Sequence, residues 1–480
     1  MSGSATRLGI EHLFVLMLEN RSFDHMLGFS QITGMDAVTG QITEINGLSG
    51  AESNFYNGQE FRVSEGASYR VQADPPHEFT DVLHQLCGYA ATYSAGGAYP
   101  AIDNSGYVEA YARNGGQNDP GEIMKCYGPE QLPVLNALAC EFVVCDNWHA
   151  SLPGPTWPNR FFVHAASSGG LDHSPRTDEI VRWETLAGFS FPNGTIFDAL
   201  QSAGIKRRLY AGDDFPVISA LKGIHLDDIR PFSLFASDLH QASFDYSYVF
   251  IEPRYDVLHE YRAGNSQHPL ADVTQGESLI KTIYDTIRNS PVWKKSMLVI
   301  TWDEHGGFYD HGIPPAATAP GDTAPGCEYN NSGFTFEQYG PRVPAVIVSP
   351  LIPKNTIDHR VYDHASIPAT VESLFGLPAL TGRDAAAARL DALITLNAAR
   401  DDTPESLPAP AVAAAPAARP DAPVNDGNVP GILNSAMRQD LALAPGQAAA
   451  ITARVAGIST RGEALQYLAE VQQKLRAHRA

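Results

Sequence analysis

The sequence has little of several features that mark common protein classes. Its five cysteines are an odd number and no C-x-x-C pair occurs, so complete intrachain disulfide pairing and a zinc site of that pattern are not expected. No run of 18 apolar residues exists, which excludes an ordinary transmembrane helix. The apolar stretch at residues 13–18 is too short for a signal-peptide core. These deficits predict a cytoplasmic protein, or a secreted or periplasmic one that has lost a leader.

Positive charge is also scarce. Lysine and arginine together number 33 against 54 aspartates and glutamates, which gives a formal net charge of -21. Such a surface repels nucleic-acid phosphates and anionic membranes. We therefore expect no nucleic-acid partner and at most transient contact with a membrane surface. A small-molecule or phospholipid substrate, zwitterionic or neutralised by a metal, fits this charge better. The sequence leaves the oligomeric state open.

Buried strands and helices are present in alternation. The segments 12–18, 296–301 and 343–348 are continuously apolar, as expected of parallel strands covered on both faces. Helical patterns lie at 279–288 and 366–375. This alternation predicts an α/β fold, an αβα sandwich around a mainly parallel sheet.

Loops and a tail surround this predicted core. Residues 50–130 and 312–340 are loop-rich, and long loops in a compact domain usually act as lids or binding loops. A Pro/Ala-rich stretch lies at 402–423 and predicts a linker. Beyond it, residues 462–478 have the spacing of an amphipathic helix, which would dock on the core, form a dimer contact or lie on a membrane. We therefore predict a catalytic domain (1–400), a linker (401–425) and a helical tail (426–480).

Two acidic pairs follow two of the predicted strands directly. Glu19 and Asn20 follow the first strand, and Asp303 and Glu304 follow the second. Ligands of open α/β sheets bind at such strand ends. Oxygen-bearing side chains there suit a divalent cation, whereas burying them unpaired would be costly. The alternative for the first pair is a turn in which Asn20 and Ser22 cap a helix.

Thr156 lies in a loop fixed by Pro and Gly, just before a helical pattern. The start of a helix favours an anion, and a metal-assisted hydroxyl in that place can attack phosphorus. Arg160 lies close enough in the sequence to neutralise a phosphate or an acid. The alternative is a threonine that only caps the helix.

Two histidines lie in loops rich in turn-forming residues, His77 and His268. A displaced alkoxide needs a proton, and histidine is its usual donor near neutral pH. Either histidine could instead be structural. Loop tyrosines could hold a quaternary ammonium group by cation–π contact or simply pack the loops: Tyr89, Tyr93, Tyr99, Tyr107 and Tyr111.

Five segments together resemble the bacterial phospholipase C and acid phosphatase family of phosphoesterases, within the alkaline phosphatase superfamily. They occur in family order across roughly residues 8–385: LENRSFDH (18–25), PGPTWPNRFF (153–162), TWDEHGGFYDHGIPP (301–315), GPRVPAVIVSP (340–350) and YDHASIPATVESLFGLP (362–378). The resemblance implies a bacterial enzyme with an αβα sandwich like that of alkaline phosphatase. The threonine form of the second segment looks like the phospholipase C branch.

By the same resemblance, the nucleophile is Thr156, which also contacts the metal. The other metal ligands are Glu19, Asn20, Asp303 and Glu304, and His77 and His268 look like the phosphate-binding and leaving-group histidines. The expected cofactor is one or more divalent ions, Ca²⁺, Mg²⁺, Mn²⁺ or Zn²⁺, and the resemblance leaves the choice among them open. The C-terminal β-domains of the long family members are replaced here by the linker and tail.

The expected activity is phospholipase C-type cleavage of a phosphocholine-like lipid head group through a phosphothreonine intermediate. The alternative is an acid phosphatase that acts on soluble phosphomonoesters or on other phosphodiesters.

Overall fold

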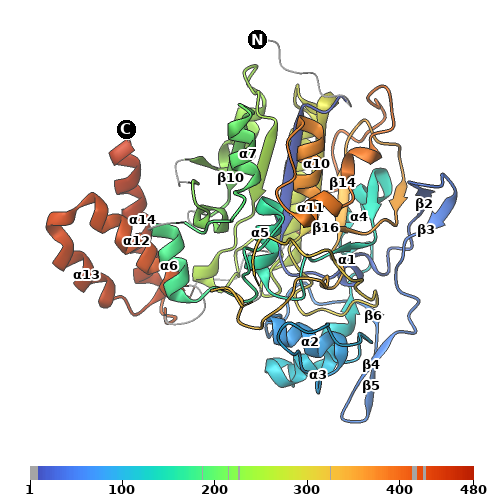
Figure 1. Ribbon diagram of the computed structural model, residues 1–480, viewed down its shortest axis with the longest axis horizontal. Coiled ribbons are helices and arrows are strands. Elements are labelled where there is room, and N and C mark those ends of the chain that lie inside the picture. The colour runs from blue at the N-terminus through green and yellow to red at the C-terminus, as the bar shows by residue number, and fades with distance from the viewer. Residues whose placement is uncertain are drawn as a thin grey trace.

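The computed structural model describes residues 9–185, 188–213, 216–224, 228–324, 326–412, 414, 419–424 and 429–479. A ten-stranded sheet forms its centre, in the order β11-β10-β12-β1-β13-β14-β8-β15-β2-β3 (Figure 1). In that order the strands are β11 (Ile229–Pro231), β10 (Arg207–Ala211), β12 (Tyr248–Glu252), β1 (His12–Leu18), β13 (Ser296–Trp302), β14 (Ala345–Val348), β8 (Val143–Cys145), β15 (Thr356–Asp358), β2 (Thr33–Asp36) and β3 (Ile42–Glu44).

The sheet is mostly parallel, as predicted. β14 is an exception, because it pairs antiparallel with both β13 and β8. The predicted strand at 343–348 is therefore present as a buried strand, but it runs against its neighbours. The edge strand β3 is also antiparallel, to β2. The strand ends that matter for the site belong to β1 and β13, which are parallel over seven paired residues.

Helices cover both faces of the sheet (Figure 1). One layer contains α4 (Pro133–Glu141), α8 (Phe235–Leu239) and α9 (Val273–Arg288), and the other contains α5 (Thr156–Ala165), α7 (Ile196–Ser202) and α10 (Ser366–Phe375). The remaining helices of the main body are α1 (Phe23–Leu27), α2 (Phe79–Cys87), α3 (Tyr107–Tyr111), α6 (Thr177–Thr185) and α11 (Gly382–Ala386). Short strand pairs join β4 (Ser53–Tyr56) to β5 (Gln59–Arg62), β6 (Ser64–Glu65) to β7 (Lys125–Cys126), and β9 (Trp148–His149) to β16 (Tyr362–Asp363).

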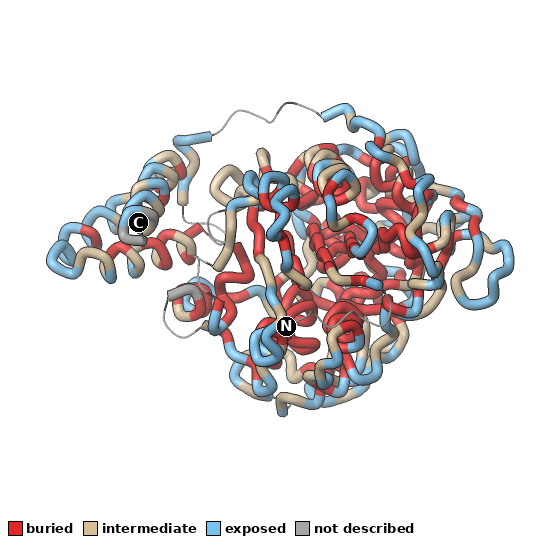
Figure 2. Tube along the Cα trace, turned by 90° about the horizontal axis from the view of Figure 1, so that it is seen from above, coloured by how far each residue is buried: buried red, intermediate tan, exposed pale blue. Residues whose placement is uncertain are grey.

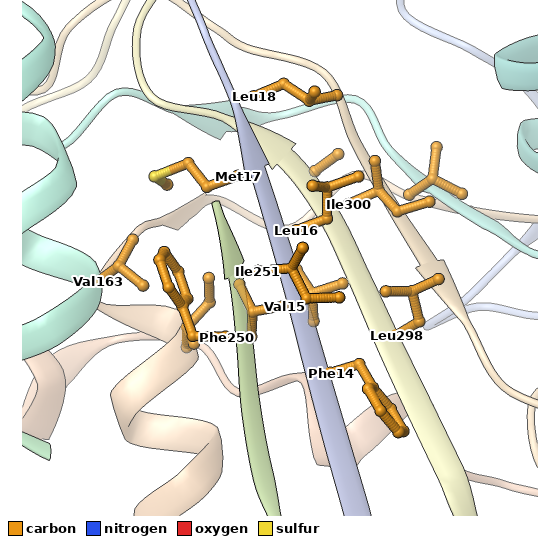
Figure 3. Close-up of a cluster of buried hydrophobic side chains, with 14 of the residues drawn as sticks. Phe14, Val15, Leu16, Met17, Leu18, Val163, Phe250, Ile251, Leu298 and Ile300 are labelled. Atoms are coloured by element: carbon orange, nitrogen blue, oxygen red, sulfur yellow. The ribbon is translucent and has the colours of Figure 1, made fainter. Parts of the chain in front are cut away.

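The central strand β1 is buried along its whole length. Its side chains alternate between the two faces, as strand geometry requires. Met17, with Phe250 of β12, points toward Val163 of α5, whereas Leu16 lies with Ile300 on the opposite side (Figure 3). A continuously apolar strand is thus explained by two covering helical layers.

The C-terminal tail forms three helices at one side of the molecule: α12 (Val429–Leu443), α13 (Ala448–Ala456) and α14 (Arg461–Arg479) (Figure 1). Their inner faces are buried and their outer faces exposed (Figure 2), which confirms the amphipathic helix expected at 462–478. α12 lies against α6, and α14 lies against α12 and the short 3₁₀ turn η6 (Val257–His259). Of the predicted linker and tail, residues 413, 415–418, 425–428 and 480 lie outside the described residues.

Arg342 holds together the segments that follow β1 and β13. Its fully buried guanidinium contacts Asp24 at 2.9 Å and Asp310 at 2.7 Å. Burial alone would lower the pKa of Arg342, but the two carboxylates outweigh burial and raise it. Arg342→Met should therefore lower the free energy of unfolding by about 3–5 kcal/mol, because two buried carboxylates lose their counter-charge. Urea unfolding checks this.

The matched control is Arg62→Met, which removes an exposed pair with Glu60 and should cost less than about 1 kcal/mol. Equal losses in the two variants would contradict the assignment of Arg342 as a buried anchor.

Candidate active site

The predicted site residues meet at the C-terminal ends of β1 and β13. Asn20 has a left-handed backbone (φ 56°), which asparagine tolerates better than most residues, and its N–H donates to Asp303 at 3.0 Å. A Cβ on Gly306 would lie 2.1 Å from the carbonyl oxygen of Asn20. The two strand-end turns therefore press together, and the glycine in the second turn makes this approach possible.

Thr156 is the first residue of α5, as predicted, but its hydroxyl does not cap the helix. Pro155 occupies the cap position, and the Thr156 hydroxyl instead donates to Oδ1 of Asn20 at 3.4 Å. The first backbone N–H groups of a helix have no intrahelical acceptor. The Thr156 hydroxyl therefore does not cap the helix, and the residue is half-buried. It lies at the N-terminal end of α5, which favours an anion.

Arg160 lies one turn further along α5 and faces the acids. Its Nε donates to Asp303 at 2.9 Å, and Nη2 donates to the carbonyl of Leu18 at 2.9 Å. Nη1 lies 3.8 Å from Glu252. The sequence allowed either a phosphate or an acid as the partner of Arg160, and the structure pairs it with an acid.

Buried carboxylates concentrate negative charge behind the site. Burial raises the pKa of Glu19 and of Asp303, and neighbouring acids raise both further, while Arg160 opposes the shift. Oε2 of Glu19 and Oε1 of Glu304 are buried and accept no hydrogen bond from the protein. Such orphaned oxygens need an explanation, and they fit the oxygen-rich donor set that a divalent cation takes.

The structure does not itself display a closed metal centre. Among the described residues, no three His, Cys, Asp or Glu side chains are grouped closely enough to enclose an ion. Both carboxylate oxygens of Asp303 already accept hydrogen bonds, from Asn20, Glu304 and Arg160. The ligand set Glu19, Asn20, Thr156, Asp303 and Glu304 therefore stays a prediction, although the five residues lie on adjoining turns.

The two predicted histidines line the same cavity, together with Asp74. His77 Nδ1 lies 2.8 Å from the Pro75 carbonyl, and its Nε2 lies 3.3 Å from the Asn20 amide nitrogen. Burial lowers the pKa of His77, but Glu304 and Asp74 outweigh that effect and raise it to about 9.

His268 has the opposite electrostatic setting. It stacks on Tyr261 with ring centroids 3.6 Å apart, and its Nε2 lies 3.6 Å from Asp74. Burial lowers the pKa of His268 to about 4, against the pull of Asp74. The neighbouring acids therefore favour the protonated form of His77, whereas burial favours the neutral form of His268.

Other histidines near the acids serve as supports. His305 Nε2 lies 2.8 Å from Gln85 and its Nδ1 lies 3.3 Å from Glu304. His364 Nε2 lies 2.6 Å from the carbonyl oxygen of Asp303. Because each is fully buried, these contacts fix the strand-end turns rather than face a substrate.

A cavity of about 140 Å³ joins these groups to an apolar wall. That volume is well above the roughly 10–15 Å³ that one water needs. The polar side is formed by Thr156, Glu19, Asp74, His77 and His268, whereas Asn20, Asp303, Glu304 and Arg160 are fully buried behind it. The apolar and aromatic part of the lining is formed by Trp157, Ile180, Val217, Tyr255, Val257, Tyr261 and Ile432.

Sequence reasoning missed this part of the lining. Ile432 and Ser435 of α12 line the cavity, although the sequence placed the tail in a unit of its own beyond the linker. The five loop tyrosines that could have held an ammonium group are not among the cavity's lining residues; Tyr107, Tyr111 and Tyr99 belong to small apolar clusters under the loops. The aromatic residues of the cavity are Trp157, Tyr255 and Tyr261.

The αβα sandwich brings buried acids, a hydroxyl at a helix start and two histidines together at its strand ends. This arrangement is typical of hydrolases that act on phosphate esters. The sequence matches the phosphoesterase family over residues 10–378. The chain belongs to that family and is a phosphoric ester hydrolase.

Two phospholipases C are similar to this chain over most of its length. Non-specific phospholipase C3 of Arabidopsis thaliana is 36% identical over 424 residues, which span 85% of this chain and 77% of the relative. Phospholipase C B of Mycobacterium tuberculosis (strain ATCC 25618 / H37Rv) is 25% identical over 418 residues, 77% of this chain and 74% of the relative.

A solved alkaline phosphatase superfamily protein from Vibrio parahaemolyticus is 17% identical and covers 55% of this chain and 66% of its own, with a TM-score of 0.33. That similarity is too low to carry weight. No helix among the described residues is long and apolar enough to cross a bilayer.

Proposed function

We propose that the protein is a divalent-metal-dependent phospholipase C, which releases a phosphocholine-like head group through a covalent threonine ester. The observation that carries this proposal is the position of Thr156. Its hydroxyl does not cap α5 and shares one cavity with His77, His268 and Glu19. The names of the plant and mycobacterial relatives support the substrate class, and the net charge agrees with a zwitterionic head group.

In the first half-reaction, Thr156 Oγ1 bonds to phosphorus in line with the leaving alcohol, and the bond between phosphorus and that alcohol's oxygen breaks. The alkoxide takes a proton from His77, which the surrounding acids keep protonated. The product is a threonine phosphodiester that still carries the head group. In the second half-reaction, water bonds to phosphorus and gives a proton to His77. The bond between phosphorus and Thr156 Oγ1 breaks, Oγ1 takes a proton back from solvent, and the phosphorylated head group leaves.

A divalent cation would be held by Glu19, Asn20, Asp303, Glu304 and Thr156; when bound, it would help the threonine proton pass to solvent and would offset phosphoryl charge. Arg160 acts as a positioning residue, because its guanidinium holds Asp303 and the end of β1 in place. Its cation also balances the buried acids when no ion is bound.

The effect of His77 on the cleavage rate should depend on the leaving group. His77→Gln should slow phosphatidylcholine cleavage by roughly 10²–10⁴-fold, because an alkoxide needs a proton. It should slow the release of p-nitrophenol from p-nitrophenylphosphorylcholine by less than about tenfold in the first turnover, since p-nitrophenolate departs unprotonated. The measurement is the rate of the first half-reaction on both substrates by rapid quench, because the second half-reaction, in which water gives its proton to His77, is the same for both.

His268→Gln is the matched control, since His268 is neutral and should not show this dependence on the leaving group. A loss that is equal for both substrates in His77→Gln would contradict its role as the acid. Wild-type activity on p-nitrophenyl phosphate without activity on either diester would favour the alternative, an acid phosphatase.

A further inference from the structure

A second cavity adjoins the candidate active site. It is about 210 Å³ and lies between the main body and the tail helices α12 and α14. Three residues line both cavities: Tyr255, Val257 and Ile432. The two cavities thus adjoin at these side chains, and a chain-like ligand that starts at Thr156 would pass them to reach the second cavity.

The lining of the second cavity is chemically apolar. Leu258, Leu465, Leu468 and Ala469 join the shared residues. Its two acids are already engaged: Asp213 accepts from the backbone N–H groups of Tyr255 and Asp256. Asp256 in turn accepts from the backbone N–H of Ala263 at 2.8 Å and lies 2.7 Å from the ring of His259. The remaining surface favours hydrocarbon over a charged or hydrogen-bonding group.

Specific contacts fix the tail at this place. Arg461 of α14 donates to the carbonyl oxygen of Val257 at 2.9 Å. Gly431 of α12 lies so close to α6 that a Cβ there would be 3.1 Å from Ile180. Lys474 of α14 contacts Asp440 of α12 at 2.6 Å. The second cavity is therefore a defined space that exists because the tail is docked.

We propose that this second cavity is a binding site for an acyl chain of the lipid substrate, built jointly by the η6 turn and the C-terminal helices. The proposal rests on the proposed function. It assigns binding of the diacylglycerol part of the lipid, which is the leaving alcohol, to the tail helices. The occupant follows from continuity with the candidate active site and from the apolar lining. The tail residues that contact it are determinants of substrate specificity and take no part in the chemistry at Thr156.

The test fills the second cavity from its rim. Ala469 is exposed on α14 and lines the cavity, so Ala469→Trp places an indole there without disturbing the buried core. Ala453→Trp, at an exposed position of α13 that lines neither cavity, is the matched control. Gln472→Trp at the same rim is a second variant. Thermal melts verify that all three fold.

Ala469→Trp should lower kcat/KM on long-chain phosphatidylcholine in mixed micelles at least tenfold. It should leave p-nitrophenylphosphorylcholine, which has no acyl chain, within twofold of wild type. Ala453→Trp should change neither rate. Equal rates of Ala469→Trp and wild type on the long-chain lipid would overturn the proposal.

A binding measurement separates this proposal from the proposed function. Wild type should bind dioctanoylglycerol, the alcohol part of a short-chain lipid, at least tenfold more tightly than Ala469→Trp does, by isothermal titration calorimetry. Such binding without phospholipase turnover would contradict the proposed function and support the acyl site. Phospholipase turnover with equal binding of dioctanoylglycerol by wild type and Ala469→Trp would support the proposed function and contradict the acyl site.

Discussion

Thr156→Val should lower kcat by at least ~10³-fold on every phosphate ester that the enzyme cleaves, because no other group replaces a covalent nucleophile. Valine has nearly the shape of threonine and can begin a helix. Pro155 holds the cap position of α5, so removing the hydroxyl costs the helix no capping bond. The loss would therefore report chemistry and not folding. Steady-state kinetics and a thermal melt of the same sample measure both.

Thr156→Ser is the matched control. It keeps the hydroxyl beside Asn20 and should retain measurable activity. Thr156→Val activity within tenfold of wild type would sink the covalent mechanism. A water molecule would then be the better nucleophile.

Asp303→Asn should weaken metal binding by at least ~10²-fold. It should also raise the activation free energy of the reaction by several kcal/mol, because transition-state stabilisation by the metal is lost. Asparagine keeps an oxygen for the N–H groups of Asn20 and Glu304, which donate to Asp303 now. It removes the negative charge that both Arg160 and a cation would need. Metal analysis of the purified variant, together with its kinetics, measures the effect.

Asp310→Asn is the matched control. Asp310 is equally buried, follows the same strand, and pairs with Arg342 outside the cavity. That variant should lose stability but keep its metal. Full metal occupancy in Asp303→Asn would remove Asp303 from the ligand set.

The fold was largely predictable because it depends on local patterns. A strand such as 12–18, apolar at every position, has few alternatives to a place between two helical layers. The direction of β14 was not predictable in this way, since periodicity carries no information about which way a strand runs. The place where the tail docks was also beyond the sequence. An amphipathic helix shows that it has a partner, but the spacing does not name α6 and η6 as that partner.

The candidate site divides along the same line. Residues directly after strands or at a helix start, such as Glu19, Asp303 and Thr156, are positioned by the elements beside them, so the sequence could propose them as site residues. Asp74 and Tyr261 sit in irregular loops that fold over the strand ends, and nothing local marks them. Asp24, Asp310 and Arg342 lie within the recognised segments. Their opposite charges were the available sequence signal, and the structure pairs and buries them.

The covalent step is tested most directly by rapid acid quench of wild-type enzyme during its first turnovers, followed by mass spectrometry of the peptide that contains Thr156. With p-nitrophenylphosphorylcholine, the peptide should carry phosphocholine on Thr156, and with p-nitrophenyl phosphate it should carry phosphate. Thr156→Val under the same conditions should carry neither. Product release through a full turnover with an unmodified Thr156 peptide at every quench time, or with the modification on another residue, would contradict a threonine nucleophile.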